Sequence, residues 1–126
     1  MEFLIVFLGG GLGSAGRHGT NLLAARLFGV AYPVGTLCIN VLGSFLMGVV
    51  VEYFALKSGL SQQLRLFLAT GILGGFTTFS TFSLEAALLN SRGEPGAAVL
   101  YIAASIVLGV GALYLGLAAV RLALHA

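Results

Sequence analysis

Residues 74–83 read Gly-Gly-Phe-Thr-Thr-Phe-Ser-Thr-Phe-Ser, which places hydroxyl groups and phenyl rings together inside an apolar segment. Phe79 and Phe82 are three residues apart, so they share one face if this segment is helical. A phenyl ring is electropositive at its edge, so rings presented edge-first can hold an anion without a full positive charge. Ser80 and Thr81 would add hydroxyl donors beside them. The run favours a route for a small anion, although two core phenylalanines are the simpler interpretation.

The composition of the chain indicates lipid rather than water as its solvent. Of the 126 residues, 59% are apolar and 8% are charged, and the mean hydropathy is +1.07. A helix needs roughly 20 mostly apolar residues to cross a membrane. Polar or turn-forming interruptions leave four such stretches, at residues 3–27, 33–56, 63–90 and 97–122. We therefore predict an all-α membrane protein in which residues 1–126 form a single domain of four transmembrane helices.

The same composition excludes several kinds of site. The six cationic residues are spread singly, without the clustered stripe that nucleic-acid binding requires. Cys38 is the single cysteine, which rules out an internal disulfide, and we interpret it as a small buried apolar residue. His18 and His125 lack companion ligands, and no nucleophile is paired with a base, so an enzyme is not supported. The first apolar run follows Glu2 rather than a basic leader, and we expect it to remain in the protein.

One glycine motif is misleading. Residues 11–16 read Gly-Leu-Gly-Ser-Ala-Gly and satisfy the G-x-G-x-x-G pattern of dinucleotide-binding folds. That fingerprint requires a βαβ unit and an acidic residue about 20 positions further on. Residues 31–37 contain no acidic side chain and lead into another apolar stretch, so we reject nucleotide binding.

The positive charges are nearly balanced between the two ends of the predicted bundle. If the N-terminus is cytoplasmic, that side carries three cationic residues and the other side two, namely Lys57, Arg65 and Arg121 against Arg26 and Arg92. Because loop Lys and Arg residues set membrane orientation, such a chain is able to insert either way up. We find no internal repeat, and four helices enclose little interior. The sequence therefore favours an antiparallel homodimer.

The third stretch differs in kind from the other three. It contains Gly71, Gly74 and Gly75, followed by a run of hydroxyl residues, a composition that weakens a helix and can cap freed backbone groups. We predict a helix break near residues 74–78. Non-helical backbone at membrane depth survives only inside protein or along a cavity, and its carbonyl groups can hold a cation.

Small and polar residues recur at helical spacing on the other stretches. Four of them follow one another every four residues on the second stretch, at Thr36, Asn40, Ser44 and Gly48. We interpret the small residues as seams where helices approach closely. Asn40 is different, because an unpaired amide is costly to bury in a membrane. Either a neighbouring helix or a solute must satisfy it, and the sequence leaves both open.

Two charged residues lie well inside the apolar stretches. Arg17 is in the first stretch and Glu85 in the second half of the third. Charged groups in such positions are rare and often mark ion routes. The alternatives are a structural ion pair or a side chain that reaches the headgroup region.

Taken together, these motifs resemble the CrcB or Fluc family of fluoride channels over the whole chain. The most specific is Gly74-Gly75-Phe76-Thr77-Thr78-Phe79-Ser80-Thr81-Phe82-Ser83, supported by Gly35-Thr36-Leu37-x-x-Asn40-x-x-Gly43-Ser44-Phe45-x-x-Gly48 and by Gly11-x-Gly13-x-x-x-Arg17. The resemblance implies a bacterial inner-membrane channel that lets fluoride leave the cell passively. It also implies an antiparallel, dual-topology homodimer with two pores, in agreement with the charge balance.

The resemblance further assigns roles to individual residues. Phe79 and Phe82 would line the pores with their ring edges, and Asn40 would contribute to the pathway. A structural sodium ion, required but not transported, would be held by the backbone carbonyls of Gly74 and Thr77. The remaining expected pathway residues are Arg17 near the vestibule, Glu85, Tyr101 and Ser105. The family often continues the hydroxyl row of the fourth helix, where this chain has Gly109 and Leu113.

Two other classes of protein would share this size and hydropathy. A small proton-coupled multidrug exporter needs a carboxylate near the middle of its first helix, but the only acid there is Glu2 at the edge. A structural membrane subunit would explain the glycine seams but not the run of hydroxyls and phenyl rings. The sequence therefore favours a channel.

Overall fold

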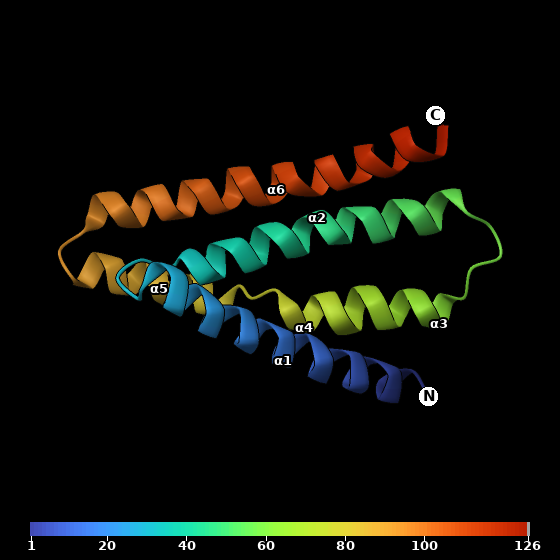
Figure 1. Cartoon of the computed structure of the whole chain (residues 1–126), viewed down its shortest axis with the longest axis horizontal. Coiled ribbons are helices and arrows are strands. Elements are labelled where there is room, and N and C mark those ends of the chain that lie inside the picture. The colour runs from blue at the N-terminus through green and yellow to red at the C-terminus, as the bar shows by residue number, and fades with distance from the viewer. Residues whose placement is uncertain (126) are drawn as a thin grey trace.

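The computed structural model describes residues 1–125, and over that range it is built of helices without a strand (Figure 1). The predicted all-helical class is therefore confirmed. The elements are α1 (Glu2–Phe28), α2 (Val34–Leu56), α3 (Gln62–Arg65), the π-helix η1 (Leu66–Leu73), α4 (Gly74–Phe76), α5 (Ser80–Ser91) and α6 (Pro95–His125).

Glycines end two of the helices where the chain must reverse. α1 stops at Gly29, whose φ of 77° lies in the left-handed region that side chains rarely adopt. α5 is followed by Gly93 with a φ of 81°, and the N–H groups of Gly93 and Glu94 return to the carbonyls of Asn90 and Leu89. Both turns lie at one end of the molecule, and both termini lie at the other (Figure 1).

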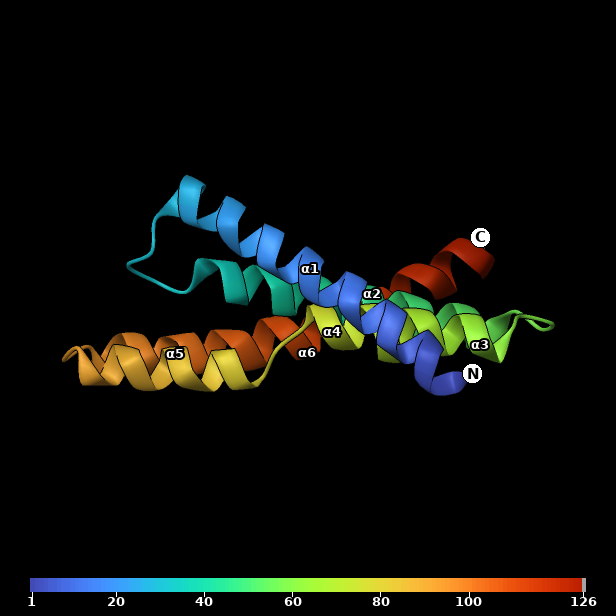
Figure 2. The same ribbon diagram turned by 90° about the horizontal axis from the view of Figure 1, so that it is seen from below.

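The helices form two pairs that meet at the centre. α2 and α6 make the most extensive contact and run in the same direction, while α1 packs across η1 and α4 (Figures 1 and 2). α5 lies against α6 beyond the break in the third stretch (Figure 2). The third stretch thus touches α1 with its first half and α6 with its second half.

Glycines lie where the helices approach one another most closely. A methyl group added at Gly48 would meet the carbonyl oxygen of Leu113, and one added at Gly116 would meet that of Phe45. α1 uses Gly13 in the same way against the Ile72 carbonyl. Removing side chains at these positions allows backbones to approach closely, which is how helices associate in lipid.

Three helical segments are long and apolar enough to cross a membrane within residues 1–125: Val34–Leu56, the compound segment Gln62–Ser91 and Pro95–His125. They agree closely with three of the predicted stretches. α1 has 27 residues but is not among them. Its second half carries Arg17, His18 and Arg26, which lower its apolar character.

The predicted helix break near residues 74–78 is confirmed. α4 continues through Phe76, and the chain leaves the helix at residues 77–79. Gly71 and Gly75 remain helical because they admit the α1 backbone: a methyl group at Gly71 would lie 3.0 Å from the Gly9 Cα atom. The sequence did not predict the π-helix η1, which contains Gly71 and precedes Gly75.

The prediction that Cys38 is buried was wrong. Its side chain lies on the exposed surface of the chain. The inward-facing positions around it belong to Thr36 and Ile39, which are almost completely buried. On a helix embedded in lipid an apolar residue has no need to face inward, so polarity alone did not identify the buried face.

Candidate functional site

Asn40 on α2 pairs with the broken backbone of the third span. Its Nδ2 group donates to the Thr78 carbonyl at 2.9 Å, and its Oδ1 atom accepts from the Thr78 N–H at 2.8 Å. The Asn40 side chain therefore pairs with both backbone groups of Thr78, its N–H and its carbonyl, in place of the partners that a helix would supply. Of the two alternatives for Asn40, a neighbouring segment supplies these partners, and one donor and one lone pair of the amide remain.

The hydrogen bonds at the break release two backbone carbonyls. In a continuous helix the Thr78 N–H would bond to Gly74 and the Thr81 N–H to Thr77. Here Thr78 donates to Asn40, and Thr81 donates to the Thr78 hydroxyl at 3.2 Å. The carbonyl groups of Gly74 and Thr77 are therefore left without the N–H donors that a continuous helix would provide. These are the two carbonyl groups expected from the sequence to hold a cation. Carbonyl oxygens are suitable ligands for a hard cation.

The two phenylalanines have very different surroundings. Phe82 is 9% exposed and packs against Tyr101 on α6, with 5.2 Å between ring centroids and planes tilted by 56°. Phe79 lies 5.5 Å from Phe82 but is 78% exposed on the single chain. The simpler interpretation, that these residues are core phenylalanines, therefore holds for Phe82 within this chain. It does not describe Phe79, whose ring is left mostly uncovered by residues 1–125.

A polar contact continues from Phe82 toward the end of the molecule opposite the termini. The Tyr101 hydroxyl donates to Glu85 Oε1 at 3.3 Å. Two hydroxyls on the neighbouring seam, Thr36 Oγ1 and Ser105 Oγ, are buried without a hydrogen-bond partner in residues 1–125. Since an unpaired buried hydroxyl is costly, this seam has unused capacity to bind a polar solute.

A cavity of about 310 Å³ lies at this end. Its polar lining includes Asn21, Thr36, Glu85 and Arg92. A surface cluster connects the two loops beside it: Tyr32 donates to Glu94 at 2.9 Å, and Arg92 donates to the same carboxylate at 2.6 Å. The Arg92 hydrogen bond holds the pKa of Glu94 below its usual value, and the bond to Glu94 raises the pKa of Tyr32.

A second groove, of about 260 Å³, adjoins the break itself. Asn40, Thr77, Thr78 and Phe79 line it together with Ser44 from α2 and Leu113 from α6. The structure therefore brings Asn40 and Phe79 into one groove, and it links Phe82, Tyr101 and Glu85 by direct contact.

Other predicted residues lie outside these two hollows. Ser80 is exposed at the start of α5, Thr81 is half-buried above Thr78, and Gly74 is exposed. Arg17 is half-buried in α1 and makes no salt bridge with residues 1–125. An ion pair of the chain instead joins the buried Glu52 on α2 to the exposed Arg121 on α6, at 3.1 Å.

Sequence reasoning missed three residues of the site. Thr78 is the partner of Asn40, and only its place in the hydroxyl run pointed to it. Thr36 and Ser44 were interpreted through their spacing with Gly48 as members of a packing seam. Their hydroxyl groups were the available signal, because packing alone is satisfied by glycine or alanine.

The fold and the site define a class: an all-helical, multi-pass membrane protein with a broken span whose freed backbone, amide and hydroxyl groups meet at a groove. Residues 4–117 match the family described as "CrcB-like protein, Camphor Resistance (CrcB)", and the chain belongs to this family.

Similar proteins cover nearly the whole chain. One from Granulibacter bethesdensis is 60% identical over 96% of this chain and 95% of its own length. Another from Rhodopseudomonas palustris (strain BisB5) is 54% identical over 96% and 98% of the two chains, and one from Methylobacterium nodulans is 55% identical over 96% and 97%. Each is named "Fluoride-specific ion channel FluC". An ion channel is not an enzyme, in agreement with the expectation from sequence.

Proposed function

We propose that this chain is a fluoride-specific ion channel that lets fluoride leave a bacterial cell passively across the inner membrane. The names of its relatives support this function. The observation that carries it in this chain is the exposed ring of Phe79 beside Asn40 and the hydroxyl groups of one groove. Fluoride holds its water tightly, so a route through lipid must replace that shell with donors such as hydroxyls, an amide and the positive edges of rings.

The proposal includes α1 as a fourth membrane span. Both termini lie at the same end of the molecule (Figure 1), which requires an even number of crossings. α1 has 27 residues, and an ideal helix of that length exceeds the roughly 30 Å of hydrocarbon in a bilayer. Arg17 would then lie within the membrane, where its field raises the local concentration of anions.

The functional unit in this proposal is an antiparallel homodimer. The Phe79 ring and the groove beside it are open on one chain, and lipid would otherwise contact the Asn40 amide and the hydroxyls. A second copy of this chain covers them and completes two equivalent routes. The nearly equal positive charge at the two ends supports insertion in both orientations.

A structural sodium ion belongs to the same proposal. The carbonyls of Gly74 and Thr77, released by the hydrogen bonds of Thr78 and Thr81, are the groups that would hold it. Two carbonyls from each of two chains would give four oxygen ligands, and the ion would tie the two breaks together without being transported. If so, replacing sodium with a larger monovalent cation should lower fluoride flux, and equal flux in both would contradict the sodium site.

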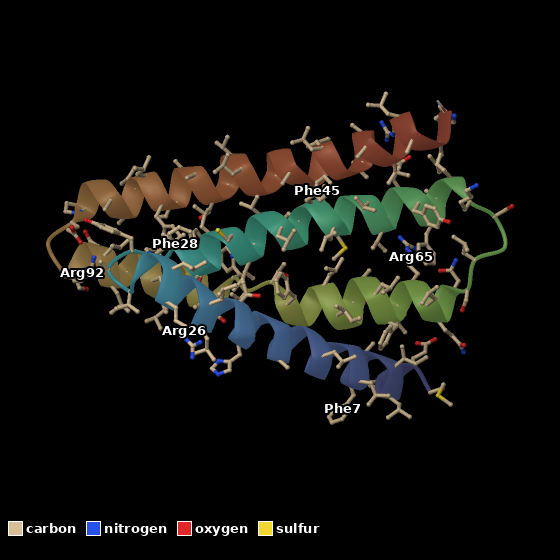
Figure 3. All side chains as sticks on the ribbon, in the orientation of Figure 1. Phe7, Arg26, Phe28, Phe45, Arg65 and Arg92 are labelled. Carbon is tan, nitrogen blue, oxygen red and sulfur yellow. The ribbon has the colours of Figure 1, made fainter. Side chains whose placement is uncertain are left out.

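The test is fluoride efflux from liposomes that contain the purified protein, followed with a fluoride electrode. We expect rapid loss of fluoride while chloride is retained. Phe79→Ile and Phe82→Ile should each lower the flux at least about tenfold, the equivalent of losing one favourable contact of about 1.4 kcal/mol. Phe7→Ile is the matched control, since Phe7 projects from the outer side of α1 (Figure 3) and is 75% exposed. Retention of fluoride by vesicles with folded protein would reject the channel.

A further inference from the structure

The hydroxyl row on α6 stops halfway along its contact with α2. Tyr101 and Ser105 are one helical turn apart on the buried face of α6, and the next position on that face is Gly109. One turn further the side chain is Leu113, which lines the groove at the break. An anion that leaves Ser105 along α6 therefore finds no donor side chain for two turns.

Ser44 on α2 lies where the missing donor would be. A Cβ atom built on Gly109 has a single neighbour within 4 Å outside its own helical surroundings, the hydroxyl oxygen of Ser44 at 3.9 Å. Ser44 also lines the groove that contains Asn40 and Phe79. The Ser44 hydroxyl therefore lies between the α2–α6 contact that contains Ser105 and the groove at the helix break.

Two other polar groups of this groove have each committed a proton. The Thr77 hydroxyl donates to the Leu73 carbonyl at 3.0 Å, and one Asn40 N–H is held by Thr78. No acceptor within residues 1–125 takes the proton of Ser44. The groove has no charged residue in its lining, so an anion there depends on such free donors.

We infer that Ser44 donates a hydrogen bond to the passing anion and takes over from the α6 hydroxyls at Gly109. This inference rests on the proposed fluoride channel and adds a residue of the route on a second helix. The row of polar side chains then passes from Tyr101 and Ser105 on α6 to Ser44 and Asn40 on α2.

The decisive experiment moves the hydroxyl from one helix to the other. Ser44→Ala should lower fluoride flux in liposomes about tenfold, as expected for one hydrogen bond to a charged group. The space at Gly109 admits a side chain, so Ser44→Ala combined with Gly109→Ser should recover most of the flux. Ser44→Ala combined with Gly109→Ala is the matched control, because alanine adds the Cβ atom at residue 109 without a hydroxyl. The fluoride flux of this variant should not recover.

Further variants test whether a lower flux results from the loss of the hydrogen-bond donor or from misfolding of the protein. Ser44→Cys keeps the volume but donates weakly, so its flux should fall between those of the wild type and Ser44→Ala. Ser91→Ala removes an exposed serine hydroxyl far from the groove and should conduct normally. All variants should elute at the same size as the wild type.

The outcomes distinguish this inference from the function on which it rests. Absence of flux in the wild type rejects both. Wild-type flux with equal flux in Ser44→Ala rejects only the role of Ser44, as does equal recovery by Gly109→Ser and Gly109→Ala.

Discussion

Asn40 stabilises the break because its side chain has the same donor and acceptor geometry as a peptide group. It satisfies both backbone groups of Thr78 at 2.8 and 2.9 Å, and it does so from a different helix. Backbone groups without a partner are very costly in the membrane interior. A single amide therefore allows the chain to leave the helix at Thr77 without stranding Thr78.

Asn40→Ala should destabilise the protein, because it leaves the Thr78 N–H and carbonyl unpaired. Each unpaired group costs about 1–3 kcal/mol, so the loss should appear as a clearly lower unfolding temperature in detergent. Fluoride flux should fall with it.

Asn40→Asp separates the two hydrogen bonds of this pair. A carboxylate accepts from the Thr78 N–H but repels the Thr78 carbonyl, so we expect it to be no better than alanine for flux. Asn90→Ala is the control, since Asn90 is exposed near the end of α5. Normal stability and flux in Asn40→Ala would contradict the role given to this pair.

At the scale of the elements, the sequence predicted which segment breaks and the approximate place, but not which of its glycines stay helical. Glycines weaken a helix, and on that basis the break was expected near residues 74–78. Gly71 and Gly75 instead serve the contact with α1, which single-sequence reasoning cannot see because the partner is far away in the chain. The position of the break is fixed by Asn40, another distant residue.

The glycines of α6 should differ sharply in their tolerance of a methyl group. Gly116→Ala would bring its Cβ atom against the Phe45 carbonyl and force α2 and α6 apart, whereas Gly111 has open space. Overpacking of this kind costs about 1–3 kcal/mol. Gly116→Ala should lower the unfolding temperature in detergent, and Gly111→Ala should leave it unchanged. Equal stability of the two variants would show that the seam is looser than described.

The loops opposite the termini should respond to pH through Glu94. Its pKa is lowered by Arg92 from an ordinary value near 4.5, so its contribution to stability is present above that value and is lost as the pH falls through the lowered pKa. The pKa of Tyr32 is raised by Glu94 from 10.0, so its contribution is present below 10.0 and is lost as the pH rises further.

The measurement is the unfolding temperature of the wild type and of Glu94→Gln as a function of pH. We expect a small difference, because the cluster is exposed. It should be constant from about pH 5 to 9 and should shrink below about pH 4. Glu2→Gln, which changes an exposed carboxylate outside the cluster, is the control. A difference that grows in acid would contradict the assigned hydrogen bonds.

At the scale of the whole molecule, composition was sufficient to predict a helical membrane protein, and the stretches at 33–56, 63–90 and 97–122 agree with the observed helices. The sequence also predicted which cationic residues share an end of the bundle. Lys57 and Arg65 lie at the end with the termini, and Arg26 and Arg92 lie at the opposite end, near the turns (Figures 1 and 3). The ion pair between Glu52 and Arg121 could not be predicted from the sequence, because it depends on how α2 and α6 align.

Balanced charge leads to a last prediction about orientation. A cysteine placed in the turn at Ala31 and another placed at Ser58 lie at opposite ends of the molecule. In a Cys38→Ala background, each single-cysteine protein should be labelled by an impermeant thiol reagent to about half of its amount in intact cells, since both orientations are populated.

Adding three lysines after residue 125 should shift this balance, because positive residues near a span hold it on the cytoplasmic side. The turn at Ala31 should then become mostly accessible from outside, and Ser58 mostly inaccessible. If an antiparallel pair is the working unit, fluoride flux should fall as one orientation is depleted, and co-expression with a variant biased the other way should restore it. Full flux from a chain locked in one orientation would exclude the antiparallel pair while leaving the route within each chain intact.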